Sequence, residues 1–187
     1  MLVDPSTRAS VAVPEWWHCR RMTPAELLTD TFGRIRDGVH RVLADLDDDA
    51  LTARPGPDAN TIGWLVWHLL RVQDDHVAEV AGTEQVWTSQ GYAGRAGLPF
   101  DDDATGYGQS VEEVGQVRVG VALLGEYADA VTDATLAYVA GLGPDDLDRV
   151  VDDAWDPPVT LAVRLVSVIS DDLQHVGQAG YAKGLLG

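Results

Sequence analysis

Two segments far apart in the chain place metal-ligating types of side chain where a folded core is expected. His68 lies inside an otherwise apolar run of a predicted helix, so its imidazole should point inward. Asp171 and His175 stand four residues apart in a later apolar stripe, and Asp172 and His175 stand three apart. Either spacing puts a carboxylate and an imidazole on one side of a helix. Because charged groups that face a core are costly unless they are paired or bind a metal, both segments predict ligands.

The types of these side chains indicate which ion they would hold. Two imidazole nitrogens and one carboxylate oxygen suit Zn²⁺, with Ni²⁺ or Fe²⁺ as alternatives. Three protein ligands leave a coordination position open, which is typical of catalytic sites, and the lack of cysteine ligands argues against structural zinc. For His68 alone the alternative is a histidine hydrogen-bonded within the core. For the later pair the alternative is an aspartate that orients a neutral histidine.

Further residues lie near these ligands on the predicted helices and are candidates for binding substrate or for orienting the ligands. Each of them also has an alternative structural role. The tryptophans would pack in the core, the aspartates would form salt bridges, and the amide of the glutamine would pack between helices. The candidates are Trp64, Trp67, Asp75, Asp172 and Gln178. His76 is the reserve ligand, whereas His18 and His40 are expected at the surface, and Cys19 lies outside the cluster.

Amphipathic helices must position these side chains. The capping box Thr-Pro-Ala-Glu, with proline at the first helical position, opens a helix expected over 23–46. Its apolar residues recur at alternating spacings of four and three, which is one stripe on a helix. A second helix is expected over about 60–80, capped by Asp58 or Asn60 and ended by Gly82.

The second half of the chain predicts two more helices. A capping box at its start opens a helix expected over 110–140, and a fourth helix is expected over 160–183, ending at Gly184. One helical turn is expected at 145–148, and no strand is expected. Residues 82–109, here called the crossover, are rich in Gly, Pro and Asp and predict little regular structure. A loop this long is usually functional, or it spans the length of a bundle.

Four amphipathic helices without a strand predict an all-α fold, namely a four-helix bundle. The long crossover between the second and third helices permits an up-down-down-up topology. We expect a single domain over 1–187, with an irregular lead-in at 1–22. No apolar run is long enough to span a membrane, and the N-terminus lacks the apolar stretch of a secretory signal. With its single cysteine, the chain is expected in the cytoplasm.

Composition narrows the classes of partner. The formal net charge is −17, from 30 acidic and 13 basic residues. Such a surface repels phosphates and anionic lipid, so neither nucleic acid nor a membrane is expected as a partner. The expected partner is a small-molecule substrate, and leftover apolar helix faces would suit a homodimer. Arginine greatly outnumbers lysine, and Ala, Val, Asp and Gly are abundant, which is typical of a GC-rich bacterial genome.

The sequence around both ligand segments resembles the DinB-like superfamily, and within it the mycothiol-dependent enzymes related to maleylpyruvate isomerase. The resemblance is carried by residues 60–70, NTIGWLVWHLL, and 171–178, DDLQHVGQ. It extends over roughly residues 23–186. It implies a helical bundle with a divalent metal and mycothiol as co-substrate. The GC-rich composition is compatible with an actinobacterial source.

The resemblance also assigns ligands. The second helix of the family presents one histidine, here His68, and the fourth presents a His-x3-His or Glu-x3-His pair. His175 matches the second member of that pair and Asp171 matches the first, so the resemblance favours Asp171 over Asp172. Aspartate replaces the usual histidine or glutamate and is one carbon shorter than glutamate, which could loosen the site or change its metal.

The leading functional hypothesis is a metal-dependent thiol S-transferase that acts on a small electrophile. The metal would bind an external thiol, as the resemblance implies for mycothiol, and lower its pKa so that the thiolate attacks. A first alternative is a hydrolase that uses metal-activated water, with Asp75 or Asp172 as general base. A second alternative is a non-enzymatic bundle for ligand binding or stress response, in which the aspartate marks a weakened site.

Overall fold

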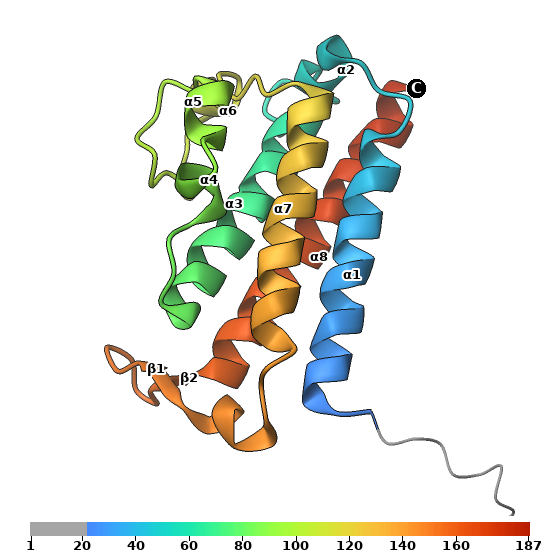
Figure 1. The fold of residues 1–187 in the computed structure, drawn as a ribbon. Helices are drawn as coiled ribbons and strands as arrows, with labels where there is room; N and C mark the ends of the chain where they lie inside the picture. The colour runs from blue at the N-terminus through green and yellow to red at the C-terminus, as the bar shows by residue number, and fades with distance from the viewer. Residues whose placement is uncertain (1–21) are drawn as a thin grey trace, which may run out of the picture.

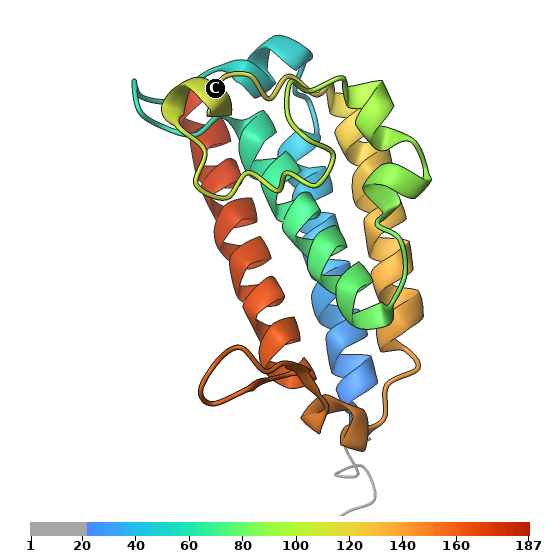
Figure 2. The ribbon, with the colours of Figure 1, turned by 90° about the vertical axis from the view of Figure 1, so that its left-hand side faces the viewer.

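The computed structural model describes residues 22–187, in which four long helices form a bundle. Along the chain they run up, down, down and up, as Figures 1 and 2 show. The crossover joins the second of them to the third along the outside of the bundle. The predicted all-α four-helix bundle is therefore confirmed. The long helices are α1 (Pro24–Leu43), α3 (Ile62–Ala81), α7 (Val121–Val139) and α8 (Leu161–Leu186).

The first two long helices begin and end with recognisable local signals. Thr23 forms both hydrogen bonds of the predicted capping box at the start of α1. Thr61 caps α3 through its hydroxyl, so the expectation of Asp58 or Asn60 was wrong by one to three residues. Gly82 ends α3 in the left-handed region with a φ of 69°, where glycine carries no steric penalty. These signals place His68 in the middle of a well-defined helix.

Helix α3 lies at the centre of the packing. It contacts both α7 and α8, and buried residues lie all around its circumference. Apolar side chains from all four long helices form one core around it. Four polar side chains of α3 are buried nonetheless, namely His68, Arg71, Gln73 and Asp74. Since a buried polar group is costly without a partner, each of these four requires an explanation.

The third predicted helix is in fact two helices. Helix α6 (Val111–Val114) has the predicted capping box at Ser110, but it ends after one turn. Helix α7 begins only after Gly120 because a distant residue caps it. The carboxylate of Asp48 accepts a hydrogen bond from the backbone nitrogen of Val121 at 2.8 Å. The apolar residues that predicted one helix are therefore divided between α6 and α7, and a tertiary contact determines where α7 begins.

Several short elements were not predicted. The chain adds three helices of four or five residues and a two-stranded antiparallel ribbon, so the expectation of no strand was wrong there. Helix α8 also runs past Gly184 rather than ending at it. The predicted helical turn after α7 is present as the 3-10 helix η2. The short elements are α2 (Asp48–Thr52), α4 (Val86–Ser89), α5 (Tyr92–Ala96), η2 (Pro144–Asp148), β1 (Val150–Asp152) and β2 (Val159–Thr160).

The predicted lead-in at 1–22 falls almost entirely outside the described residues, and so do His18 and Cys19. His40 lies at the surface as expected and contacts the carboxylate of Asp129. None of the helices within 22–187 combines the length and the apolar character that crossing a membrane requires.

Candidate metal centre

Three predicted ligands converge between α3 and α8. His68 comes from α3, and Asp171 and His175 come from successive turns of α8. One ligand atom from each residue lies within 4.8 Å of the other two. His68 Nε2 lies 3.9 Å from Asp171 Oδ2, and the two imidazole rings meet edge to face with centroids 4.6 Å apart. Two segments a hundred residues apart in the chain thus meet within the span of one ion.

Backbone carbonyls determine which nitrogen of each imidazole is free. His68 Nδ1 lies 2.5 Å from the carbonyl oxygen of Thr105, and His175 Nδ1 lies 2.9 Å from that of Asp171. Because a carbonyl oxygen only accepts, each Nδ1 carries a proton and donates it. In the neutral imidazoles each Nε2 therefore keeps its lone pair. Metal-binding histidines commonly have this arrangement, with the second nitrogen held by a carbonyl or carboxylate.

One carboxylate oxygen of Asp171 lacks a hydrogen-bond partner. Its Oδ2 atom is buried and receives no hydrogen bond. His175 Nδ1 lies 3.2 Å away, but the proton of that nitrogen is directed to the backbone carbonyl of Asp171. A buried acceptor without a partner costs about 1–3 kcal/mol, and a cation would satisfy it. The set of two nitrogens and one oxygen fits a divalent ion such as zinc.

Burial and mutual charge shift the protonation of all three residues. Burial lowers the pKa of His68, although the Thr105 carbonyl opposes it. The carboxylate of Asp171 raises the pKa of His175 against the effect of burial. Burial alone would raise the pKa of Asp171, but contact with His175 and the charges of both histidines lower it. At neutral pH His68 is neutral and Asp171 is ionised, which are the forms that bind metal.

An indole and a loop enclose the centre. The Trp64 ring stacks on His68 with centroids 4.6 Å apart, and its Nε1 donates to Gln109 Oε1 at 2.7 Å. The crossover passes over the outer side of α3 and α8 (Figure 2). Gly106 has a φ of 94°, and a Cβ there would lie 2.9 Å from both His68 Nδ1 and the Trp67 ring. Glycine is therefore required where the crossover meets the imidazole.

The two aspartates proposed as general bases differ in position. Asp75 accepts a hydrogen bond from Gln85 Nε2 at 2.6 Å, so its carboxylate is tied to the crossover. Asp172 is fully buried on the core side of α8, and neither of its oxygens has a hydrogen-bond partner. Burial raises the pKa of Asp172 well above its ordinary value, and the charge of Asp171 adds to the effect. Because Asp172 is fully buried, its carboxyl group is poorly placed to take a proton from a substrate.

The remaining candidates lie around the centre in different ways. Trp67 packs against Trp87 and Phe100 and belongs to the core. Gln178 is exposed and lines a groove between the start of α3 and the end of α8. His76, the reserve ligand, contacts Arg164 through Nδ1 at 3.2 Å and is absent from the cluster. Within residues 22–187 the ligand atoms that converge are those of His68, Asp171 and His175.

Sequence reasoning missed three residues that shape the centre. Thr105 acts through its backbone carbonyl, which any residue type would supply, so no signal pointed to it. Gly106 is one of several glycines in the crossover, and its sequence context does not distinguish it. Arg71 left a clear signal, because it is a charged residue between Leu70 and Val72 in a helix whose other residues are mostly apolar and buried.

Comparison with known proteins agrees with this fold. The family model described as DinB superfamily matches residues 31–179. A conserved protein from Enterococcus faecalis, known from its crystal structure, is similar with a TM-score of 0.82 and 30% sequence identity. The alignment covers 89% of this chain and 98% of that one. No curated protein matches the sequence. With the family model spanning most of the bundle and both ligand segments, the chain belongs to the DinB superfamily.

Proposed function

We propose that His68, Asp171 and His175 bind one divalent metal ion, with zinc as the first candidate and nickel or iron as alternatives. The observation that carries the proposal is the convergence of three ligand atoms within 4.8 Å, one of them a buried oxygen without a hydrogen bond. Members of the DinB superfamily often bind a divalent metal. Three protein ligands leave room for a further ligand, as in catalytic sites.

Elemental analysis tests the metal site directly. The protein is purified from metal-replete medium, and its metal content is compared with that of His175→Ala. His40→Ala is the matched control, because His40 also contacts an aspartate but lies at the surface. We expect about one equivalent of metal in the wild type and the control, and a large loss in His175→Ala. Equal metal content in all three proteins would exclude the site.

We further propose that the centre serves thiol transfer to a small electrophile, with mycothiol as the thiol. The only cysteine of the chain is Cys19, so residues 22–187 contain no thiol of their own. A divalent ion held by these residues would lower the pKa of a thiol and favour the thiolate at neutral pH. In the transfer, the thiolate sulfur forms a bond to an electrophilic carbon. A leaving group departs with its electron pair, or an epoxide opens and its oxygen takes a proton from water.

The residues around the centre have defined tasks in this proposal. The carbonyls of Thr105 and Asp171 hold the two imidazoles in one tautomer and orientation. Trp64 covers one face of His68 and, with the crossover, shields that side of the centre from water. Shielding strengthens electrostatic interactions at the site. The substrate therefore meets a centre that is rigid on the α3 side.

A conjugation assay distinguishes this activity from its alternatives. Metal-loaded protein is mixed with mycothiol and a model electrophile, and adduct formation is compared with that of His68→Ala. We expect acceleration that requires metal, thiol and His68 together. Turnover of an ester or amide without added thiol would favour metal-dependent hydrolysis instead. Absence of bound metal would favour a non-enzymatic bundle that binds ligands or serves a stress response.

A further inference from the structure

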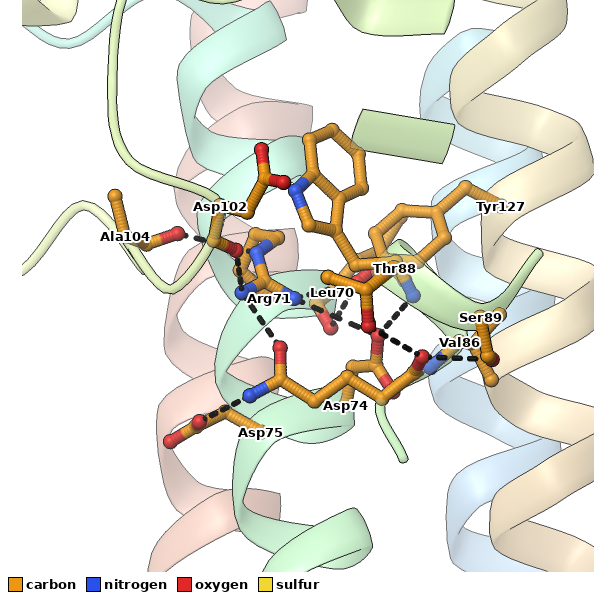
Figure 3. Close-up of polar contacts among 12 residues, drawn as sticks. Leu70, Arg71, Asp74, Asp75, Val86, Thr88, Ser89, Asp102, Ala104 and Tyr127 are labelled. Atoms are coloured by element: carbon orange, nitrogen blue, oxygen red, sulfur yellow. Dashed lines mark hydrogen bonds and ion pairs between the residues drawn. The ribbon is translucent and has the colours of Figure 1, made fainter. Parts of the chain in front are cut away.

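A second polar cluster lies on α3 one turn beyond His68, and it is centred on Arg71. The guanidinium of Arg71 is fully buried, and the cluster is drawn in Figure 3. We propose that Arg71 is a positioning residue that holds the crossover against the metal centre and thereby fixes the ring of His68. The inference rests on the proposed metal site, but it concerns a residue that lies outside the ligand set.

Arg71 binds the crossover at three points. Its Nε donates to the carbonyl of Ala104 at 3.1 Å, and its Nη2 donates to the carbonyl of Asp102 at 3.0 Å and to Gln85 Oε1 at 2.7 Å. The guanidinium also stacks over the Trp87 ring, 5.2 Å from its centroid. A planar guanidinium presents several donors in a fixed fork, which a lysine ammonium cannot reproduce. Two carbonyls of one short segment are thus clamped by one side chain.

Asp74 binds the crossover near its beginning and so adds to the contacts that Arg71 makes with it. Its carboxylate accepts hydrogen bonds from the backbone nitrogens of Val86 and Trp87, each at 2.8 Å, and from the Tyr127 hydroxyl at 2.8 Å. It also lies 3.5 Å from Arg71 Nη1. Because Asp74 holds the start of the crossover and Arg71 holds its later part, both ends of the segment are tied to α3.

The clamped segment leads directly to the metal centre. Ala104, whose carbonyl Arg71 holds, is followed by Thr105, whose carbonyl accepts the Nδ1 proton of His68. The next residue, Gly106, lies so close to His68 that a Cβ would approach Nδ1 to 2.9 Å. Arg71 and His68 are three residues apart on the same helix, so one turn of α3 both presents the ligand and anchors the loop that orients it. Displacing residues 102–104 would therefore release the His68 ring.

The test compares Arg71→Lys and Arg71→Met with the wild type in two measurements. Long-range ¹H–¹⁵N spectra of metal-free protein report the tautomer of His68, and competition with a chromophoric chelator gives the Kd for Zn²⁺. We expect a mixed His68 tautomer and a Kd weakened about 10–100-fold, the usual effect of losing a group that orients a metal ligand. The control is Gln73→Met, which removes a buried polar side chain of α3 that bonds Thr135 instead of the crossover.

The variants separate positioning from general stability. If Arg71→Met does not fold, Arg71→Lys decides, because it keeps the buried positive charge but cannot reach both carbonyls. An unchanged tautomer and an unchanged Kd in a folded Arg71 variant would overturn the proposal, and so would equal changes in Gln73→Met. If the wild type binds no zinc, the proposed metal site fails, and the His68 tautomer in metal-free protein still decides the role of Arg71.

Alanine substitutions at two glycines of the crossover test its contact with His68 independently of Arg71. Gly106 and Gly108 both have positive φ, at 94° and 73°, so alanine strains the backbone at either position. A Cβ at Gly106 meets His68, whereas a Cβ at Gly108 has no atom within 4 Å. We expect Gly106→Ala to change the His68 tautomer and weaken zinc binding, with Gly108→Ala close to the wild type in both. Equal effects of the two substitutions would contradict the proposed contact.

Discussion

Helix α3 carries two buried polar clusters one turn apart, and they differ in how fully their hydrogen bonds are satisfied. In the Arg71–Asp74 cluster, all three guanidinium nitrogens donate and both carboxylate oxygens accept. In the candidate metal centre, Asp171 Oδ2 is buried without a hydrogen bond. The first cluster needs nothing more from its surroundings, whereas the second leaves one buried oxygen without a partner, which the proposed cation would supply.

The two clusters should therefore respond differently when one of their residues is replaced. Removing a member of a satisfied network leaves its partners buried and unpaired, so the protein loses stability whether or not metal binding also changes. Replacing Asp171 in the candidate metal centre also removes the free-energy cost of its unpaired buried oxygen. The main change is therefore expected in ligand binding and not in the free energy of unfolding. Four experiments test this distinction between the two clusters.

The largest effect is expected from Arg71→Met. This change leaves Asp74 buried without its cation, and breaking a buried ion pair from one side typically costs about 3–5 kcal/mol of unfolding free energy. Urea unfolding followed by circular dichroism measures the loss. Arg34→Met is the control, because Arg34 pairs with Asp30 at the surface and should change stability by less than about 0.5 kcal/mol. Equal free energies of unfolding for the two variants would show that the buried Arg71–Asp74 pair contributes no more to stability than the exposed Arg34–Asp30 pair.

Metal binding is expected to stabilise the wild type by a smaller amount. At a free zinc concentration one hundred times the Kd, the gain in unfolding free energy is about 2.7 kcal/mol, and a chelator should reverse it. His68→Ala and Asp171→Asn should show no such gain, because each removes a ligand. His40→Ala should retain it. Thermal unfolding with and without zinc is the measurement, and a gain that persists in His68→Ala would place the ion elsewhere.

Asp172→Asn is expected to stabilise the metal-free protein in a way that depends on pH. Burial raises the folded-state pKa of Asp172, so above the ordinary aspartate pKa the folded state holds a proton that the unfolded state releases. Wild-type stability therefore falls as pH rises through that window, by at most about 1.4 kcal/mol per pH unit, and asparagine removes this loss. The advantage of the variant should grow between pH 4.5 and 7. A constant difference across this range would show that Asp172 is not protonated in the fold.

The smallest effect is expected from Trp64→Phe. The phenyl ring keeps the stack on His68 but loses the hydrogen bond from Nε1 to Gln109. One such bond contributes about 0.5–1.5 kcal/mol. Unfolding in urea measures this loss, and the zinc Kd should change little. A loss of zinc affinity as large as that in Arg71→Met would show that the hydrogen bond from Trp64 to Gln109 matters to this side of the centre as much as the Arg71 contacts do.

Much of the fold follows from interactions within a few residues of the chain. The capping boxes at Thr23 and Ser110 and the left-handed glycine Gly82 involve neighbours only, so their positions could be predicted from sequence. The ligand types at His68 and His175 stood out because polar residues in an apolar stripe need a partner. These are properties of composition and spacing, which sequence contains in full.

Other features of the fold depend on contacts between residues that are far apart in the chain. The break before α7 exists because Asp48 caps Val121 across more than seventy residues, and no local pattern indicates it. On α8 the spacing allowed either Asp171 or Asp172 to face His68, and only the packing of the helix turned one to the centre and the other into the core. The path of the crossover is determined by backbone carbonyls, whose chemistry is the same in every residue, so only the folded chain shows where they lie.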